Sequence, residues 1–194
     1  MFLFFLAVAA GNSQFTKVGG GLAVSTGFHF NNESGTDHRS GIPGASIKGI
    51  YEISLPIHIS PSFSYMIPHI TKTEFAANNS ESIVRVSSMM VDINGHYVFN
   101  SLSKFEFYAL TGLDINFARI RWKSVFNGET FKSGETDNVI GLNLGAGTYC
   151  KLTDQFDLYL EAKYILSRYD QFIFNAGVLI NLDWLIKHEE TIIN

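Results

Sequence analysis

Ionisable side chains recur at every second position within apolar runs of this sequence, and that spacing limits the chemistry they could perform. In the run FDLYLEAKY, Glu161 and Lys163 alternate with leucine and alanine. A period of two places such side chains together on one face of a β-strand. The same alternation puts further ionisable residues on the polar faces of other predicted strands: Lys48, Glu52, Asp92, His96, Glu106, Asp114 and Asp183.

Two interpretations of these polar faces follow from their charges. Buried charges persist only when they are paired, so the first is a network of ion pairs and hydrogen bonds that fills an interior. The second is a narrow polar pathway that favours cations, because acids outnumber lysines on these faces. The first is our prediction, for Lys48, Glu52, Asp92, His96, Glu106, Asp114, Glu161 and Lys163.

Two other groups of polar residues could act on lipid. Cationic side chains fall near one predicted rim, where they could meet lipopolysaccharide phosphates or form a solvated collar: Lys72, Arg85, Arg119, Arg121 and Lys123. His69 and Ser87 fall near the ends of adjacent predicted strands and could form a lipid-facing hydrolytic pair. No local motif or orienting acid accompanies them, so we expect no catalysis. No ligand spacing predicts a metal, and no cofactor is expected.

The elements that position these residues are strands joined by alternately long and short connections. Alternation predicts eight strands, over about 17–30, 45–54, 58–69, 83–99, 105–122, 138–151, 156–164 and 172–184. Polar loops are expected at 31–41, 70–82 and 123–137, and short turns at 55–57, 100–104 and 152–155. An even number of strands can close into an antiparallel up-and-down barrel with short turns at one end and longer loops at the other.

Alternation alone does not say which face of such a barrel points outward. The polar faces are rich in Gly, Ser and Asn and poor in Lys and Glu, and charged residues make up only 16% of the chain. Several aromatic residues stand near predicted strand ends, where they could form interfacial girdles: Phe30, Phe99, Phe105, Phe117, Trp122 and Trp184. These features favour a transmembrane barrel with a polar lumen over a soluble, lipocalin-like ligand-binding barrel.

Other features of the 194-residue sequence indicate how the chain is divided and which partners and cross-links are excluded. Residues 1–13 begin MFLFFLAVAA and are interpreted as a signal peptide, truncated because the usual positive segment is missing. The barrel is predicted over 15–184, and 185–194 is a polar tail. A net charge of -4 without a basic run argues against nucleic acid as a partner. Cys150 is the only cysteine, so no intrachain disulfide is possible.

Two stretches carry a family resemblance. Residues 139–164 (VIGLNLGAGTYCKLTDQFDLYLEAKY) and 59–65 (ISPSFSY) resemble the outer-membrane β-barrel domain family of Gram-negative bacteria, especially porin-like proteins of Bacteroidetes. The resemblance implies the fold and an outer-membrane location, but transfers no catalytic residue. We therefore expect a monomeric, non-enzymatic protein with a structural or interaction role. Its external loops would contact lipopolysaccharide, host surfaces or partner proteins, with a small pore or a lipid A-modifying enzyme as alternatives.

Overall fold

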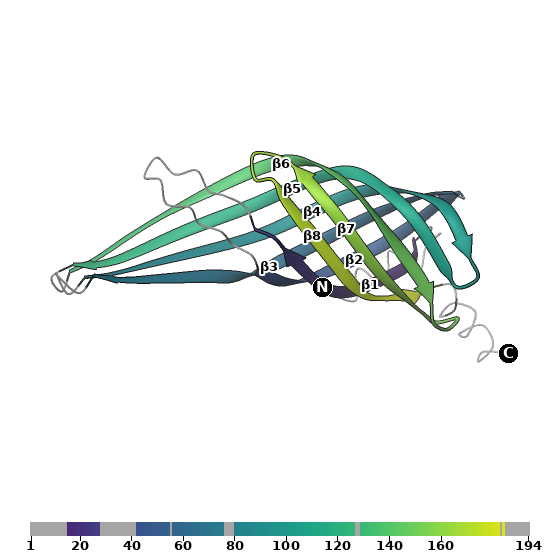
Figure 1. The fold of residues 1–194 in the computed structure, drawn as a ribbon, viewed down its shortest axis with the longest axis horizontal. Helices are drawn as coiled ribbons and strands as arrows, with labels where there is room; N and C mark the ends of the chain where they lie inside the picture. The colour runs from purple at the N-terminus through teal and green to yellow at the C-terminus, as the bar shows by residue number, and fades with distance from the viewer. Residues whose placement is uncertain are drawn as a thin grey trace.

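Eight antiparallel strands close into a ring in the computed structural model of the chain (Figure 1). The structure describes residues 15–27, 42–54, 56–75, 80–126, 129–182 and 184. The expected signal peptide and polar tail lie outside these residues, as do Phe30 and Asp183. The strands are β1 (Phe15–Ser25), β2 (Ile42–Ser54), β3 (Ile57–Phe75), β4 (Ser80–Leu102), β5 (Phe105–Phe126), β6 (Glu129–Lys151), β7 (Phe156–Leu166) and β8 (Gln171–Asn181).

Each strand pairs with its neighbours in the chain, and the pairing of β1 with β8 completes the ring. That closing pair runs in register from Lys17 opposite Asn181 to Ser25 opposite Ile173. Closure pairs the backbone donors and acceptors of every strand within the ring, as a strand in a bilayer requires. The predicted eight-stranded antiparallel barrel is confirmed. Among the described residues, no helix is long and apolar enough to cross a membrane.

The two faces of the ring differ sharply in polarity. Leu22 and Ile140 are each 70% exposed on the outside, whereas Asp92 and Asp114 are fully buried inside. In water this arrangement would expose most of the apolar surface, whereas in a bilayer the same surface contacts lipid. The alternative of a soluble barrel with an apolar interior is therefore wrong.

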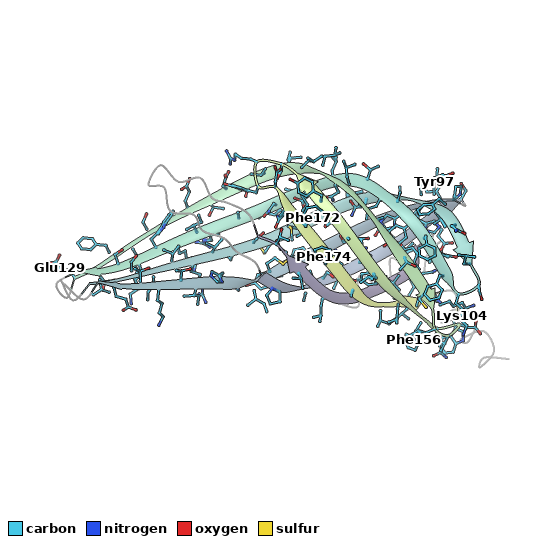
Figure 2. The ribbon with its side chains drawn as sticks, viewed as in Figure 1. Tyr97, Lys104, Glu129, Phe156, Phe172 and Phe174 are labelled. Atoms are coloured by element: carbon cyan, nitrogen blue, oxygen red, sulfur yellow. The ribbon has the colours of Figure 1, made fainter. Side chains whose placement is uncertain are left out.

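Exposed aromatic side chains mark two levels on the outside of the ring. Those nearer the short turns are Phe15, Tyr97, Phe99, Phe105 and Phe156, and those nearer the opposite end include Tyr65, Phe172 and Phe174. Tyr97, Phe156, Phe172 and Phe174 are labelled in Figure 2. From Phe105 to Phe117 on β5, a rise of about 3.3 Å per residue and a tilt of about 40° give roughly 30 Å along the axis. That length fits the apolar thickness of a membrane. The prediction that Trp122 belongs to a girdle is wrong, because Trp122 packs inward beside Ile120.

Strands β3 to β6 extend far beyond the ring as a four-stranded projection (Figure 1). They contain 19 to 23 residues, whereas β1, β7 and β8 contain 11 each. Their registers run without a loop to Phe75 opposite Ser80 and to Phe126 opposite Glu129. The predicted polar loops at 70–82 and 123–137 are therefore wrong over 70–75, 80–82, 123–126 and 129–137, which are strand. Residues 76–79, 127–128 and the predicted loop at 31–41 lie outside the described residues. Outside the membrane both faces of a sheet can be polar, so the chain stays paired without alternating in hydrophobicity.

The short turns stand together at the other end of the ring. In the predicted break between β6 and β7, the Thr153 hydroxyl accepts hydrogen bonds from the backbone N–H groups of Gln155 and Phe156, at 3.2 and 3.1 Å. Lys151 pairs with Asp154 at 2.8 Å, and this hydrogen bond lowers the pKa of the Asp154 carboxyl. The turn between β4 and β5 is shorter than predicted, and its Ser103 has a φ of 55°.

Candidate functional site

Six of the eight residues predicted to form a lumenal network have fully or almost fully buried side chains. Two lysine–carboxylate ion pairs connect members of this group, Lys48 with Glu161 and Lys163 with Asp92 at 2.6 Å, and His96 Nε2 lies 3.8 Å from a Glu161 carboxylate oxygen. Neither pair joins neighbouring strands, so both reach across the lumen. The six residues are Lys48, Asp92, His96, Asp114, Glu161 and Lys163, all at most 3% exposed.

Glu161 is the centre of the first part of this network. Its carboxylate accepts hydrogen bonds from the Tyr108 hydroxyl at 3.0 Å and from the Asn175 amide at 3.4 Å, besides pairing with Lys48. Beside it the His96 ring stacks on Tyr108, with ring centroids 4.3 Å apart. Tyr108 in turn stacks on Tyr149 at 4.5 Å.

Glycine makes this aromatic stack possible. Gly147 stands opposite Tyr108 across the β5–β6 pair, and a Cβ atom at position 147 would collide with the Tyr108 ring and the Leu160 carbonyl. The glycine-rich polar face of β6 therefore provides room for the large side chains of its neighbours. Tyr108, Tyr149 and Tyr159 fill that room, and all three are buried.

Asp92 organises the second part of the network. Its oxygens accept hydrogen bonds from the Asn143 amide at 2.8 Å and from the Ser62 hydroxyl at 3.0 Å, in addition to the Lys163 pair. Asp114 lies directly opposite Asp92 in the β4–β5 register. An eight-stranded barrel is only just wide enough for its side chains, and here they stand across its middle.

Glu52 and Glu106 lie apart from the two ion pairs, half-buried toward the short turns. Sequence reasoning missed their ionisable neighbours at this end of the lumen. Lys17 pairs with Asp157 at 2.9 Å, and His58, opposite Glu52, is 2% exposed. The alternation was sufficient to find Asp157, because it shares the face of Tyr159 and Glu161.

An apolar cluster closes the lumen toward the projection. Its buried members are Val86, Ala118, Ile120, Val139 and Tyr169, with Val84 and Trp122 packed against them. Tyr169 comes from the connection between β7 and β8, where it and Arg168 both bind the Asp137 carboxylate. Burial raises the pKa of the Tyr169 hydroxyl.

The five cations predicted at the rim all lie on the projecting strands, and all are exposed. Arg85 stands directly opposite Arg121 on β5, and Ser87 stands opposite Arg119. Lys72 and Lys123 flank Ile83 in the next row. Among the described residues, none of the ion pairs involves any of these five cations.

A groove of about 220 Å³ lies among the arginines. It is open to the outside of the sheet, next to the apolar band of the barrel. One part of its lining is apolar and aromatic, and the other part is cationic and hydroxylic. The lining residues are Tyr65, Pro68, Arg85, Ser87, Ser88, Met89, Phe117, Arg119 and Arg121.

The hypothetical Ser/His pair is not assembled. A bulge between Met66 and His69 shifts the phase of β3, so that His69 pairs with Val86, whose side chain is buried. Residues directly opposite in an antiparallel pair share a face, which puts His69 on the inner face of the sheet. Ser87 is on the outer face, where its hydroxyl donates to the Arg119 carbonyl at 3.4 Å. The prediction that both residues point outward is wrong.

A closed ring of eight antiparallel strands, apolar outside between two aromatic levels and polar inside, defines an integral membrane β-barrel. The sequence matches the outer membrane protein beta-barrel domain family over residues 1–181, and the chain belongs to that family. It is therefore an outer-membrane protein of Gram-negative type, as predicted.

Solved outer-membrane barrels share this architecture. The chain is similar to the crystal structure of Ail, the attachment invasion locus protein of Yersinia pestis, with a TM-score of 0.53 and 15% sequence identity over 86% of this chain and 98% of that chain. It is similar to the outer membrane protein OprG from Pseudomonas aeruginosa, with a TM-score of 0.55 and 10% identity over 84% and 93%. Identities this low establish a shared fold. No relative was found among curated proteins.

Proposed function

We propose that this chain is a non-catalytic interaction protein whose binding element is the four-stranded projection formed by β3 to β6. The observation that carries the proposal is the difference in strand length. Spanning the membrane requires strands of about 11 residues, which β1, β7 and β8 supply, yet β4 and β6 each contain 23. The additional length forms an ordered sheet outside the lipid. It contributes nothing to spanning.

The edges of this projection suit a protein partner. In the pairings that the structure describes, β7 meets β6 only from Leu142, opposite Leu166, and β2 meets β3 only up to Met66, opposite Gly44. Beyond these points β6 and β3 have no described partner strand on their outer sides. Strand edges of this kind accept an additional extended segment through main-chain hydrogen bonds. A partner with an exposed extended segment is the class that fits.

The likeness to solved barrels is compatible with this role. Ail, whose fold this chain shares, is named for attachment and invasion. At 15% identity the likeness transfers no ligand, so the proposal rests on the strands of this chain alone.

The strand register shows where the projection can be shortened to test whether it is the binding element. Residues 67–87 and 119–136 would each be replaced by Asn-Gly, because Met66 pairs with Ser88 and Ala118 with Asp137, so that most of the projection is removed. A two-residue Asn-Gly turn closes such hairpins well. Full-length and shortened proteins would be displayed on Gram-negative cells that lack a homologue. Binding of fluorescently labelled serum and extracellular-matrix proteins would then be measured.

We expect binding above that of empty cells for the full-length protein and loss of binding for the shortened one. Heat-modifiable gel migration checks that the shortened barrel folds, and Lys104→Gln at the opposite end serves as the control. Equal binding by the full-length and shortened proteins, or no binding above empty cells, would contradict the proposal.

A further inference from the structure

We propose that the outer-face groove between β3, β4 and β5 is a binding site for a phosphorylated glycolipid of the outer leaflet, with Arg85, Arg119 and Arg121 contacting its phosphate. This site lies on the broad face of the projection, whereas the proposed partner surface is its edge. The inference is therefore independent of the proposed function.

The first argument is the arrangement of charge. Arg85 and Arg121 are directly opposite each other on adjacent strands, with Arg119 one outward position away. Like charges in directly opposite positions destabilise a strand pair unless an anion stands between them. No described ion pair involves these arginines, so no described carboxylate takes that place.

The second argument is the chemistry of the donors. A guanidinium offers planar, bidentate hydrogen bonds that match phosphate oxygens. The Ser87 hydroxyl lines the same groove, where it can exchange its long 3.4 Å hydrogen bond to the Arg119 carbonyl for one to a phosphate oxygen. On the far side, Gly134 is opposite Arg121 on β6, so no side chain there competes for the guanidinium.

The third argument is the position of the groove relative to the membrane. Phe117 and Met89 are directly opposite each other at the top of the apolar band, and both line the groove together with Tyr65. Arg119 is two residues beyond Phe117, a rise of about 6–7 Å along the strand. The cations are therefore at headgroup depth, while the apolar lining is at the depth of acyl chains. A phosphorylated lipid would contact both the arginines and the apolar lining, whereas free phosphate would contact only the arginines.

The test uses the full chain folded in alkyl maltoside micelles, which contain no phosphate. Native mass spectrometry would count bound bisphosphorylated lipid A, chemically dephosphorylated lipid A, and lipid A in competition with inorganic phosphate. The test variant is Arg85→Gln with Arg121→Gln. The control variant, Lys104→Gln with Lys132→Gln, removes the same charge from exposed positions outside the groove. Arg121→Lys retains the charge but loses the bidentate geometry.

We expect the double arginine variant to bind bisphosphorylated lipid A about 30-fold more weakly than the unaltered protein, since each cation near a phosphate surface contributes about a factor of five. The control should bind normally and Arg121→Lys should be intermediate. Heat-modifiable migration verifies that every variant is folded. Equal binding of dephosphorylated lipid A, an equal loss in the control, or displacement by equimolar inorganic phosphate would each overturn the assignment.

Discussion

Replacing Glu161 by glutamine should strongly destabilise the barrel, because it removes a charge and almost no volume. The side chains of Lys48 and Glu161 are 2% and 1% exposed, so water does not replace the lost partner. After Glu161→Gln, the Lys48 ammonium retains the Tyr159 ring, whose centroid is 4.8 Å away. Breaking a buried ion pair by removing one partner costs about 3–5 kcal/mol. The remaining cation–π contact contributes about 1–2 kcal/mol, so we expect a loss near the lower end, about 3 kcal/mol.

The assay is equilibrium urea unfolding in lipid vesicles, with the folded fraction read from gel migration. Lys48→Met should cost a similar amount, since it leaves the Glu161 carboxylate buried. The double variant Lys48→Met with Glu161→Gln removes both charges and should recover most of the stability. If each single variant loses about 3 kcal/mol and the double variant about 1 kcal/mol, the double-mutant cycle should give a coupling free energy of about 5 kcal/mol. Asp154→Asn, which disrupts an exposed ion pair, is the control and should leave the unfolding midpoint unchanged.

Two results would refute this reasoning. Single variants within about 1 kcal/mol of the unaltered protein would mean that the lumen is hydrated enough to solvate an unpaired charge. A double variant less stable than either single variant would mean that the side chains stabilise the barrel through packing and not through their attraction.

Three further outcomes are expected. Ser103→Gly should raise the free energy of unfolding by about 1 kcal/mol, because its φ of 55° suits glycine; an unchanged urea midpoint would contradict this. Gly147→Ala should destabilise the barrel by about 1–3 kcal/mol through its collision with Tyr108, whereas Gly95→Ala, whose Cβ would meet only the Thr111 carbonyl at 3.6 Å, should be tolerated in the same assay. Planar-bilayer recordings of the purified protein should show no conductance steps, because side chains stand across the lumen; steady cation-selective steps would support the pore alternative.

The sequence was sufficient to predict the ring because the bilayer forces every spanning strand to alternate. Leu158, Leu160 and Ala162 had to face lipid, so the direction of Glu161 and Lys163 followed. The projection was missed for the same reason. From Lys123 to Asp137 both faces are in water, and the alternation disappears although the backbone pairing continues.

The contacts within the candidate sites could not be predicted from periodicity, because they depend on strand registers and on a bulge. Lys48 and Glu161 are 113 residues apart and meet across the lumen, which requires the registers of several strand pairs. His69 changed face because of the bulge that follows Met66. The rim cations were found as a group, but the pairing of Arg85 with Arg121 depends on the β4–β5 register.

The ordered pairing of the projection has a thermodynamic consequence for recognition. From Phe117 to Phe126, β5 remains paired over about 30 Å of strand on both sides, with β4 to Val125 and with β6 to Phe126. Fixing the backbone of one flexible residue costs about 1–2 kcal/mol. A disordered loop of the same length would lose that conformational freedom only when a partner binds, whereas here folding has already removed it. A small contact area on the projection could therefore support measurable affinity.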